Sequence, residues 1–224
     1  MKRHTTQRGF TLIELLVVIT IIAILASIAV PVYNMITERA KKTKALAHAK
    51  QIALALKNYA IDEDGVYPTS DNSANEAFRE LFNRNFNSET IFFVAGSAWT
   101  PQQPDNEVGD APDYEQALEG GENHWAYVSG LVDSDKGNLP LVADGFSNQV
   151  GQYTDGRRDQ GGVWKGEDAI IIRNDGSGAQ EKLDADFRVM EDRGSGAPVD
   201  IFSAEYFDSD EPPDILNPDE PQNN

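Results

Sequence analysis

The chain of 224 residues contains no cysteine and only three histidines. The absence of cysteine excludes a disulfide framework and a thiolate metal site, and it leaves the redox compartment open. His4 lies in the basic N-terminus and His48 on a predicted helix, so only His124 remains for the rest of the chain. A histidine-based metal cluster or catalytic triad would need unusual partners, and we interpret His124 as structural. Motifs of serine hydrolases, zinc proteases, phosphate loops and dinucleotide-binding folds are also missing, so we predict no enzymatic activity.

Basic residues are scarce beyond the first quarter of the chain, whose formal net charge is −18. Residues 1–9 carry three bases and no acid, and residues 10–61 carry six bases against two acids. Residues 62–224 hold 10 bases against 35 acids. Such an acidic surface repels phosphate backbones, so we predict that it binds no nucleic acid.

One uncharged apolar run of 18 residues, Leu15–Val32, stands out near the N-terminus. As a helix it would span about 27 Å, close to a hydrocarbon core of roughly 30 Å. The three preceding bases favour a cytoplasmic N-terminus. Three interpretations compete: a secretory signal cut after the small-x-small sequence Ser27-Ile28-Ala29, a plain anchor, or a precursor cut before the apolar run.

The residues favour a cut before the run. Gly9 directly precedes Phe10, and Glu14 places a carboxylate on an otherwise apolar segment. That carboxylate would cost about 2.5–3.5 kcal/mol at a membrane-helix centre and less near an end, and an ordinary signal core has no use for it. The run from Arg8 to Glu14, RGFTLIE, resembles the cleavage and methylation motif of type IV prepilins and type II secretion pseudopilins. The resemblance implies that a prepilin peptidase cuts between Gly9 and Phe10 and N-methylates Phe10.

The resemblance also implies how the mature subunit assembles. Glu14 would pair with the Phe10 amine of a neighbouring copy, because a carboxylate surrounded by apolar helices is tolerated only when paired. Pro31 stands where the family often has a helix-kinking proline, and proline bends a helix by removing a hydrogen bond. The alternatives are that Glu14 is merely an interfacial polar residue and that Pro31 bends the helix with no role in assembly.

On this resemblance we expect a non-enzymatic filament subunit of a type II secretion-like system. Expected partners are the prepilin peptidase, other copies of the chain, minor pseudopilins, an inner-membrane assembly platform and membrane lipid. The N-terminus would be cytoplasmic and the head extracytoplasmic at the bacterial inner membrane, and the assembled filament would be periplasmic or extracellular. Two alternatives remain: a type IV pilus subunit for adhesion or motility, and a membrane-tethered binding protein or enzyme that uses the same export signal. The lack of a C-terminal cysteine pair weakens the resemblance to many large pilins.

We expect an α+β, pilin-like fold in which a long helix over 10–61 packs on a small antiparallel sheet. Residues 1–9 would be the leader, with the membrane span at about 15–32, and residues 62–207 the globular head. After Pro31, apolar residues recur at spacings of three and four, as in an amphipathic helix. The acidic, proline-rich stretch 208–224 contains no base and reads as a disordered tail.

Within the head, local signals predict individual elements. Ser73 and Glu76 resemble a capping box that opens a short helix. Asn174-Asp175-Gly176 predicts a tight turn, and Pro140 suggests that its strand lies at a sheet edge. The predicted strands are 90–94, 125–131, 139–143 and 169–173, and residues 100–123 are predicted to form a long loop.

A basic cluster follows the apolar run, at Arg39, Lys41, Lys42 and Lys44. It is either a solvated helix face or a surface that contacts the acidic heads of adjacent subunits or lipid headgroups.

Calcium is the one cofactor that the sequence suggests. The stretch from Asp133 to Asn138 has oxygen ligands at alternating positions, among them Asp133 and Asp135, and Asp144 lies where the twelfth position of a calcium loop would fall. Related major pseudopilins bind calcium in their heads. The order Gly137-Asn138 is reversed from the usual motif, so an acidic turn is the alternative.

Overall fold

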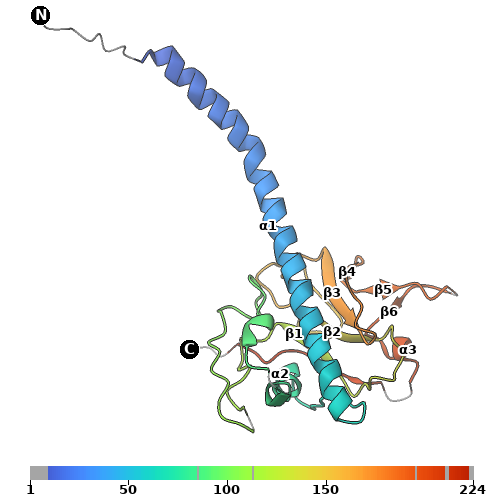
Figure 1. The fold of residues 1–224 in the computed structure, drawn as a ribbon. Coiled ribbons are helices and arrows are strands. Elements are labelled where there is room, and N and C mark those ends of the chain that lie inside the picture. The colour runs from blue at the N-terminus through green and yellow to red at the C-terminus, as the bar shows by residue number, and fades with distance from the viewer. Residues whose placement is uncertain (1–9, 85, 113, 195, 210–211, 222–224) are drawn as a thin grey trace, which may run out of the picture. The chain divides into compact units, whose positions relative to one another are not determined.

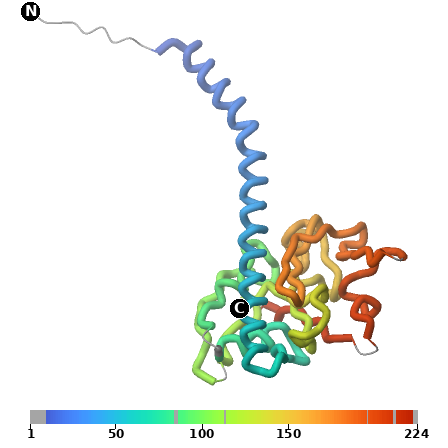
Figure 2. Tube along the Cα trace, turned by 45° about the vertical axis from the view of Figure 1, so that its right-hand side comes forward, coloured from blue at the N-terminus to red at the C-terminus, as the bar shows by residue number. Residues whose placement is uncertain are grey.

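The predicted long helix is α1, Leu12–Asp62, which contains no glycine and a single proline, Pro31. Its end is set by a left-handed turn: Asp64 and Gly65 have φ angles of 53° and 88°, and the Gly65 amide donates to the Ala60 carbonyl at 2.8 Å. Glycine suits such a position because it has no Cβ to clash. Figure 2 shows α1 curving along its N-terminal half.

The computed structural model describes residues 10–84, 86–112, 114–194, 196–209 and 212–221. It forms two compact units that divide after Lys41. The predicted leader, including Gly9, lies outside the described residues. In the N-terminal unit, the large apolar side chains of the described residues are exposed.

In the C-terminal unit, one stripe of α1 enters the hydrophobic core. Its buried members lie three or four residues apart, and they are Ala45, Ala49, Ile52, Ala53, Leu56 and Ala60. These alanines, Ile52 and Leu56 belong to the same hydrophobic core as the buried side chains of the strands. This arrangement confirms the predicted amphipathic half of the helix and the α+β, pilin-like fold class (Figure 1).

The head is built on a five-stranded antiparallel sheet in the order β4-β3-β2-β1-β7. Its strands are β1 (Trp125–Ser129), β2 (Pro140–Asp144), β3 (Asp168–Arg173), β4 (Gly178–Lys182) and β7 (Asp214–Leu216). β1 and β2 are buried along their whole length, as expected for central strands covered on both faces. A separate two-stranded ribbon pairs β5 (Met190–Glu191) with β6 (Val199–Asp200).

Short helices complete the head: α2 (Ala74–Arg79), η1 (Phe82–Arg84), η2 (Glu89–Ile91) and α3 (Ala204–Phe207). α2 begins as predicted, because the Ser73 hydroxyl accepts from the Glu76 amide at 3.3 Å. The Glu76 carboxylate does not complete a capping box and instead accepts from Ser70 and Asn72. The predicted turn at 174–176 is confirmed, since it joins β3 to β4 with Gly176 at a φ of 82°.

Three predictions about the head are wrong. Residues 90–94 form no strand. The first two belong to η2, which Ser88 caps, and Phe92 and Val94 are buried without strand pairing. Pro140 is not on an edge strand: β2 lies between β1 and β3, and its first residue can be proline because the register is irregular between Pro140 and Val142.

The third wrong prediction concerns the tail. Residues 214–216 are not disordered but form β7, which pairs with β1 and places Leu216 opposite Tyr127. Leu216 is buried. A composition rich in acids and proline does not reveal that two apolar residues, Ile215 and Leu216, complete the sheet.

Candidate functional site

The N-terminus of the described chain presents an exposed phenylalanine followed by a capped helix. Phe10 is 79% exposed. The Glu14 carboxylate accepts from the Thr11 amide at 2.9 Å and from the Thr11 hydroxyl at 2.8 Å. The Glu14 amide in turn donates to the Thr11 hydroxyl oxygen at 3.3 Å. These reciprocal bonds form a capping box, so the carboxylate is held at the helix start, four residues from Phe10.

This capping box was not predicted, although its sequence signal is present. Thr11 and Glu14 have the spacing Thr-x-x-Glu directly before an apolar run, which is the usual sequence signature of the motif. The box gives Glu14 a role within a single subunit, because it satisfies backbone donors that the first helical turn leaves free. The position of the Glu14 carboxylate is therefore set by contacts within its own chain.

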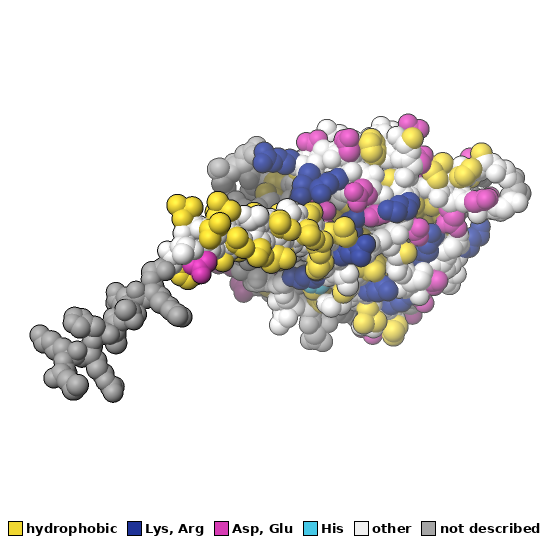
Figure 3. Space-filling model, turned by 90° about the horizontal axis from the view of Figure 1, so that it is seen from above, with side chains coloured by type: hydrophobic (Ala, Val, Ile, Leu, Met, Phe, Trp, Pro, Cys, Tyr) yellow, Lys and Arg dark blue, Asp and Glu magenta, His cyan; other side chains and the backbone are white. Residues whose placement is uncertain are grey.

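The helix that follows has the length and composition of a membrane span. Among the described residues, α1 alone is long and apolar enough to cross a bilayer. Between Phe10 and Thr37, Glu14 is the one charged residue, and hydrophobic side chains cover the exposed surface of this segment (Figure 3). Pro31 lies inside α1 without ending it.

Comparisons with known proteins match this segment. A family model described as the prokaryotic N-terminal methylation motif covers residues 4–30. The N-terminus is of the prepilin type. A type IV major pilin, PilE of Neisseria gonorrhoeae, is 40% identical over 74 residues, which are 33% of this chain and 44% of that pilin. The type II secretion system core protein G of Vibrio cholerae is 42% identical over 71 residues, or 32% of this chain and 48% of that protein.

The likeness is confined to part of each protein. A fimbrial protein of Neisseria meningitidis is also 40% identical over 74 residues and is covered to 43%, so the chain spans less than half the length of these curated relatives. No solved structure matches the chain. By their names these relatives are pilin, fimbrial and secretion-system subunits rather than enzymes. Similarity to this chain is thus shared by pilins and by a type II secretion system protein, and each of these matches covers about a third of the chain.

The three residues predicted to bind calcium are not brought together. Asp133 is exposed, and one of its oxygens accepts from Lys57 at 2.7 Å and from the Tyr67 hydroxyl at 3.1 Å. Asp135 accepts from the backbone amide of Val132 at 2.8 Å. Asp144 is buried in the core. The grouping predicted from the loop spacing does not form, because Asp144 belongs to β2 and points into the protein.

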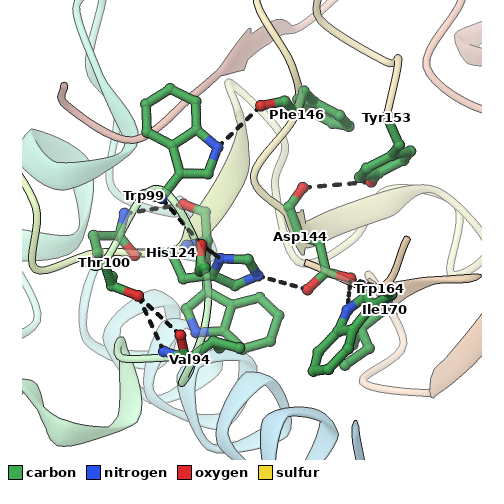
Figure 4. Close-up of polar contacts among 12 residues, drawn as sticks. Val94, Trp99, Thr100, His124, Asp144, Phe146, Tyr153, Trp164 and Ile170 are labelled. Atoms are coloured by element: carbon green, nitrogen blue, oxygen red, sulfur yellow. Dashed lines mark hydrogen bonds and ion pairs between the residues drawn. The ribbon is translucent and has the colours of Figure 1, made fainter. Parts of the chain in front are cut away.

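Asp144 is the centre of a buried polar network (Figure 4). One carboxylate oxygen accepts from the Trp164 indole at 2.8 Å and from the Ile170 amide at 2.6 Å. The other lies 2.7 Å from His124 Nε2, and because a carboxylate accepts, Nε2 is the donor. His124 Nδ1 then accepts from the Ser97 hydroxyl at 2.7 Å.

Ser97, His124 and Asp144 follow the order nucleophile, base and carboxylate, but all three side chains are buried. The Ser97 oxygen also accepts from the Trp99 amide at 3.1 Å. The network joins the loop before β1 to β2 and β3, and it satisfies polar groups that would otherwise be costly to bury. Its geometry agrees with the prediction that His124 is structural.

A cluster of three carboxylates elsewhere in the head was not predicted. Oxygens of Glu89, Asp105 and Glu122 lie within 4.8 Å of one another, a spacing that a divalent cation could bridge. Glu89 is fully buried and accepts from the backbone amides of Leu118 at 2.7 Å and Asn106 at 2.9 Å. Burial raises the pKa of Glu89 to about 7. The sequence offers no signal for this group, because its members are far apart along the chain.

Proposed function

We propose that the chain is the precursor of a filament subunit of a type II secretion-like pseudopilus. The observation that carries this proposal is the N-terminal segment itself: a methylation motif followed by an exposed apolar helix with a single carboxylate at its start. A helical segment whose large apolar side chains are exposed, as they are from Leu12 to Ile36, needs a hydrophobic environment, first lipid and then the helices of other subunits.

In this proposal a prepilin peptidase cuts between Gly9 and Phe10 and methylates the new amine of Phe10. The processed subunit then remains in the inner membrane, with its head outside the cytoplasm, until it is assembled. Other copies, minor pseudopilins and an inner-membrane platform build the filament. Glu14 leaves its bonds to Thr11 and pairs with the Phe10 amine of a neighbour, which fixes the register because an unpaired buried charge is costly. Pro31 bends the helix at the point where packing requires it.

Mass spectrometry of the N-terminal peptide tests the processing step. We expect a mature chain that begins at N-methyl-Phe10, and we expect Gly9→Val to block cleavage because the glycine gives the peptidase an unhindered backbone. A mature start at Val30 would indicate an ordinary secretory signal. An intact Met1 would indicate a plain anchor. Either result would reject the proposal.

A type IV pilus subunit is the second candidate, favoured by the 40% identity to the gonococcal pilin. The two candidates make different predictions for a strain that lacks the gene. Loss of proteins from the culture supernatant indicates a secretion pseudopilus. Loss of long surface filaments together with adhesion or motility indicates a pilus. Imaging of sheared filaments from cells with a tagged copy complements both readouts.

A further inference from the structure

The lysines of the head-bound part of α1 fall into two sets. Lys42 forms ion pairs with Asp168 and Glu167 of its own head, and Lys57 pairs with Asp133 at 2.7 Å. Lys44 and Lys50 are exposed, and within the described residues neither contacts a carboxylate. Of the four lysines on this part of the helix, Lys42 and Lys57 are therefore neutralised by their own subunit, and Lys44 and Lys50 are not.

The exposed side of α1 also carries apolar residues. Ala47, Leu54 and Ile61 are spaced by seven, so they lie along one face of the helix. All three are exposed, Leu54 at 60% and Ile61 at 79%. We call Lys44, Ala47, Lys50, Leu54 and Ile61 the outer face of α1. From Lys44 to Ile61 the sequence contains no acid.

We propose that a second copy of this chain docks on the outer face of α1 through its acidic loop, residues 101–123. This proposal rests on the proposed filament function and names the contact that would hold neighbouring heads together. Residues 101–123 contain seven acids and no base. Glu107 and Glu115 are exposed in this loop, and Pro112 adds apolar surface beside them.

Charge complementarity favours a second copy as the occupant. Residues 62–224 hold 35 acids against 10 bases, so neighbouring copies repel one another, and assembly requires contacts in which an acidic surface meets a basic one. A lipid surface fits less well. The outer face extends over about 26 Å from Lys44 to Ile61, whereas a headgroup layer is roughly 5–8 Å thick. Headgroups at one depth could not cover both ends.

Charge reversal in the full-length chain, expressed in cells, tests the contact. Lys44→Glu with Lys50→Glu should lower the yield of sheared filaments by at least about tenfold, because acid would then face acid. Adding Glu107→Lys with Glu115→Lys should restore the yield. The control, Lys136→Glu with Arg158→Glu, changes the net charge equally at exposed sites outside the outer face, and it should leave the yield near that of the parent.

Cross-linking gives an independent readout, since the chain has no cysteine of its own. Lys44→Cys combined with Glu115→Cys should yield disulfide-linked dimers in filaments, and each single substitution should not. If the parent forms no filaments, the proposed function fails. If the parent forms filaments but neither the cross-link nor the rescue appears, only the docking proposal is overturned. If the lysine variant instead lowers the amount of membrane-bound protein and leaves the fraction found in filaments unchanged, the lysines contact lipid and the docking proposal is overturned.

Discussion

The two units of the molecule differ in the exposure of their large apolar side chains. From Phe10 to Ile36 the large apolar side chains are exposed, whereas among the described residues from Lys42 onward only Leu54, Ile61, Val66 and Val150 are. The head buries most of its large apolar side chains within its own fold. Those of the N-terminal segment are exposed and can contact other molecules. The first unit therefore depends on its environment for stability, and the second depends on its internal packing.

The largest effect should come from removing the one charge in the exposed segment. Glu14→Leu should leave membrane insertion and cleavage after Gly9 intact but abolish incorporation into filaments. Loss of the Glu14 carboxylate would leave the Phe10 amine of a neighbouring subunit unpaired, and breaking a buried ion pair costs about 3–5 kcal/mol. Sheared-filament yield relative to membrane-fraction yield measures the effect.

Thr20→Leu is the matched control, because it also replaces a polar side chain of the apolar run by leucine. The Thr20 hydroxyl bonds only within its own helix, to the Leu16 carbonyl at 2.8 Å, so this variant should assemble normally. If Glu14→Leu filaments are as abundant as the parent's, Glu14 is an interfacial polar residue with no role in assembly.

In the head, the substitution expected to have the largest effect on stability is at Asp144. Asp144→Ala leaves the Trp164 indole, the Ile170 amide and His124 without their acceptor. We expect the fragment 38–224 to lose about 3–5 kcal/mol of unfolding free energy, since each orphaned buried group costs about 1–3 kcal/mol. Denaturant unfolding measures it. Asp133→Ala, which removes an exposed carboxylate paired with Lys57, should cost less than about 1 kcal/mol. Equal losses would mean that the buried network does not stabilise the core.

These two regions also differ in how far sequence predicts them. The N-terminal helix depends on local pattern and composition, so its span and its motif could be recognised from adjacent residues such as Gly9 and Glu14. β4 was missed because Gly178–Lys182 is largely exposed and polar, and its pairing with β3 determines its structure. β7 and the Glu89 group join residues that are distant in sequence. No local pattern specifies such contacts, which only the packed head creates.

Glu89 gives the stability of the head a dependence on pH. Burial raises the pKa of Glu89 from 4.5 to about 7, and burial also raises the pKa of the neighbouring Glu122. A folded head that keeps a proton which the unfolded chain releases loses stability as pH rises from about 4.5 to about 7. The change from Glu89 is at most about 3.5 kcal/mol, at about 1.4 kcal/mol per pKa unit.

Glu89→Gln should therefore flatten the stability profile of the fragment between pH 4.5 and pH 7. Unfolding midpoints measured at several pH values report the slope, which does not depend on how the glutamine changes absolute stability. Glu115→Gln is the control, because it removes an exposed carboxylate from the loop that contains Glu122 and should keep the parent's slope. An unchanged slope in Glu89→Gln would show that Glu89 titrates alike in the folded and unfolded chains.

The smallest effect should come from the capping box, where the exposed unit depends on a contact within its own chain. Thr11→Val keeps the side-chain shape but removes the hydroxyl that accepts from the Glu14 amide and donates to its carboxylate. Loss of an N-cap costs about 0.5–2 kcal/mol, and the backbone bond from residue 11 to Glu14 remains available. Amide hydrogen exchange of the full-length chain in detergent micelles should therefore quicken at residues 12–14 by roughly 2- to 30-fold. Thr20→Val, inside the helix, should leave those amides unchanged. If Thr11→Val also leaves them unchanged, the first turn is held by its apolar surroundings, and the N-terminal unit depends on its environment even there.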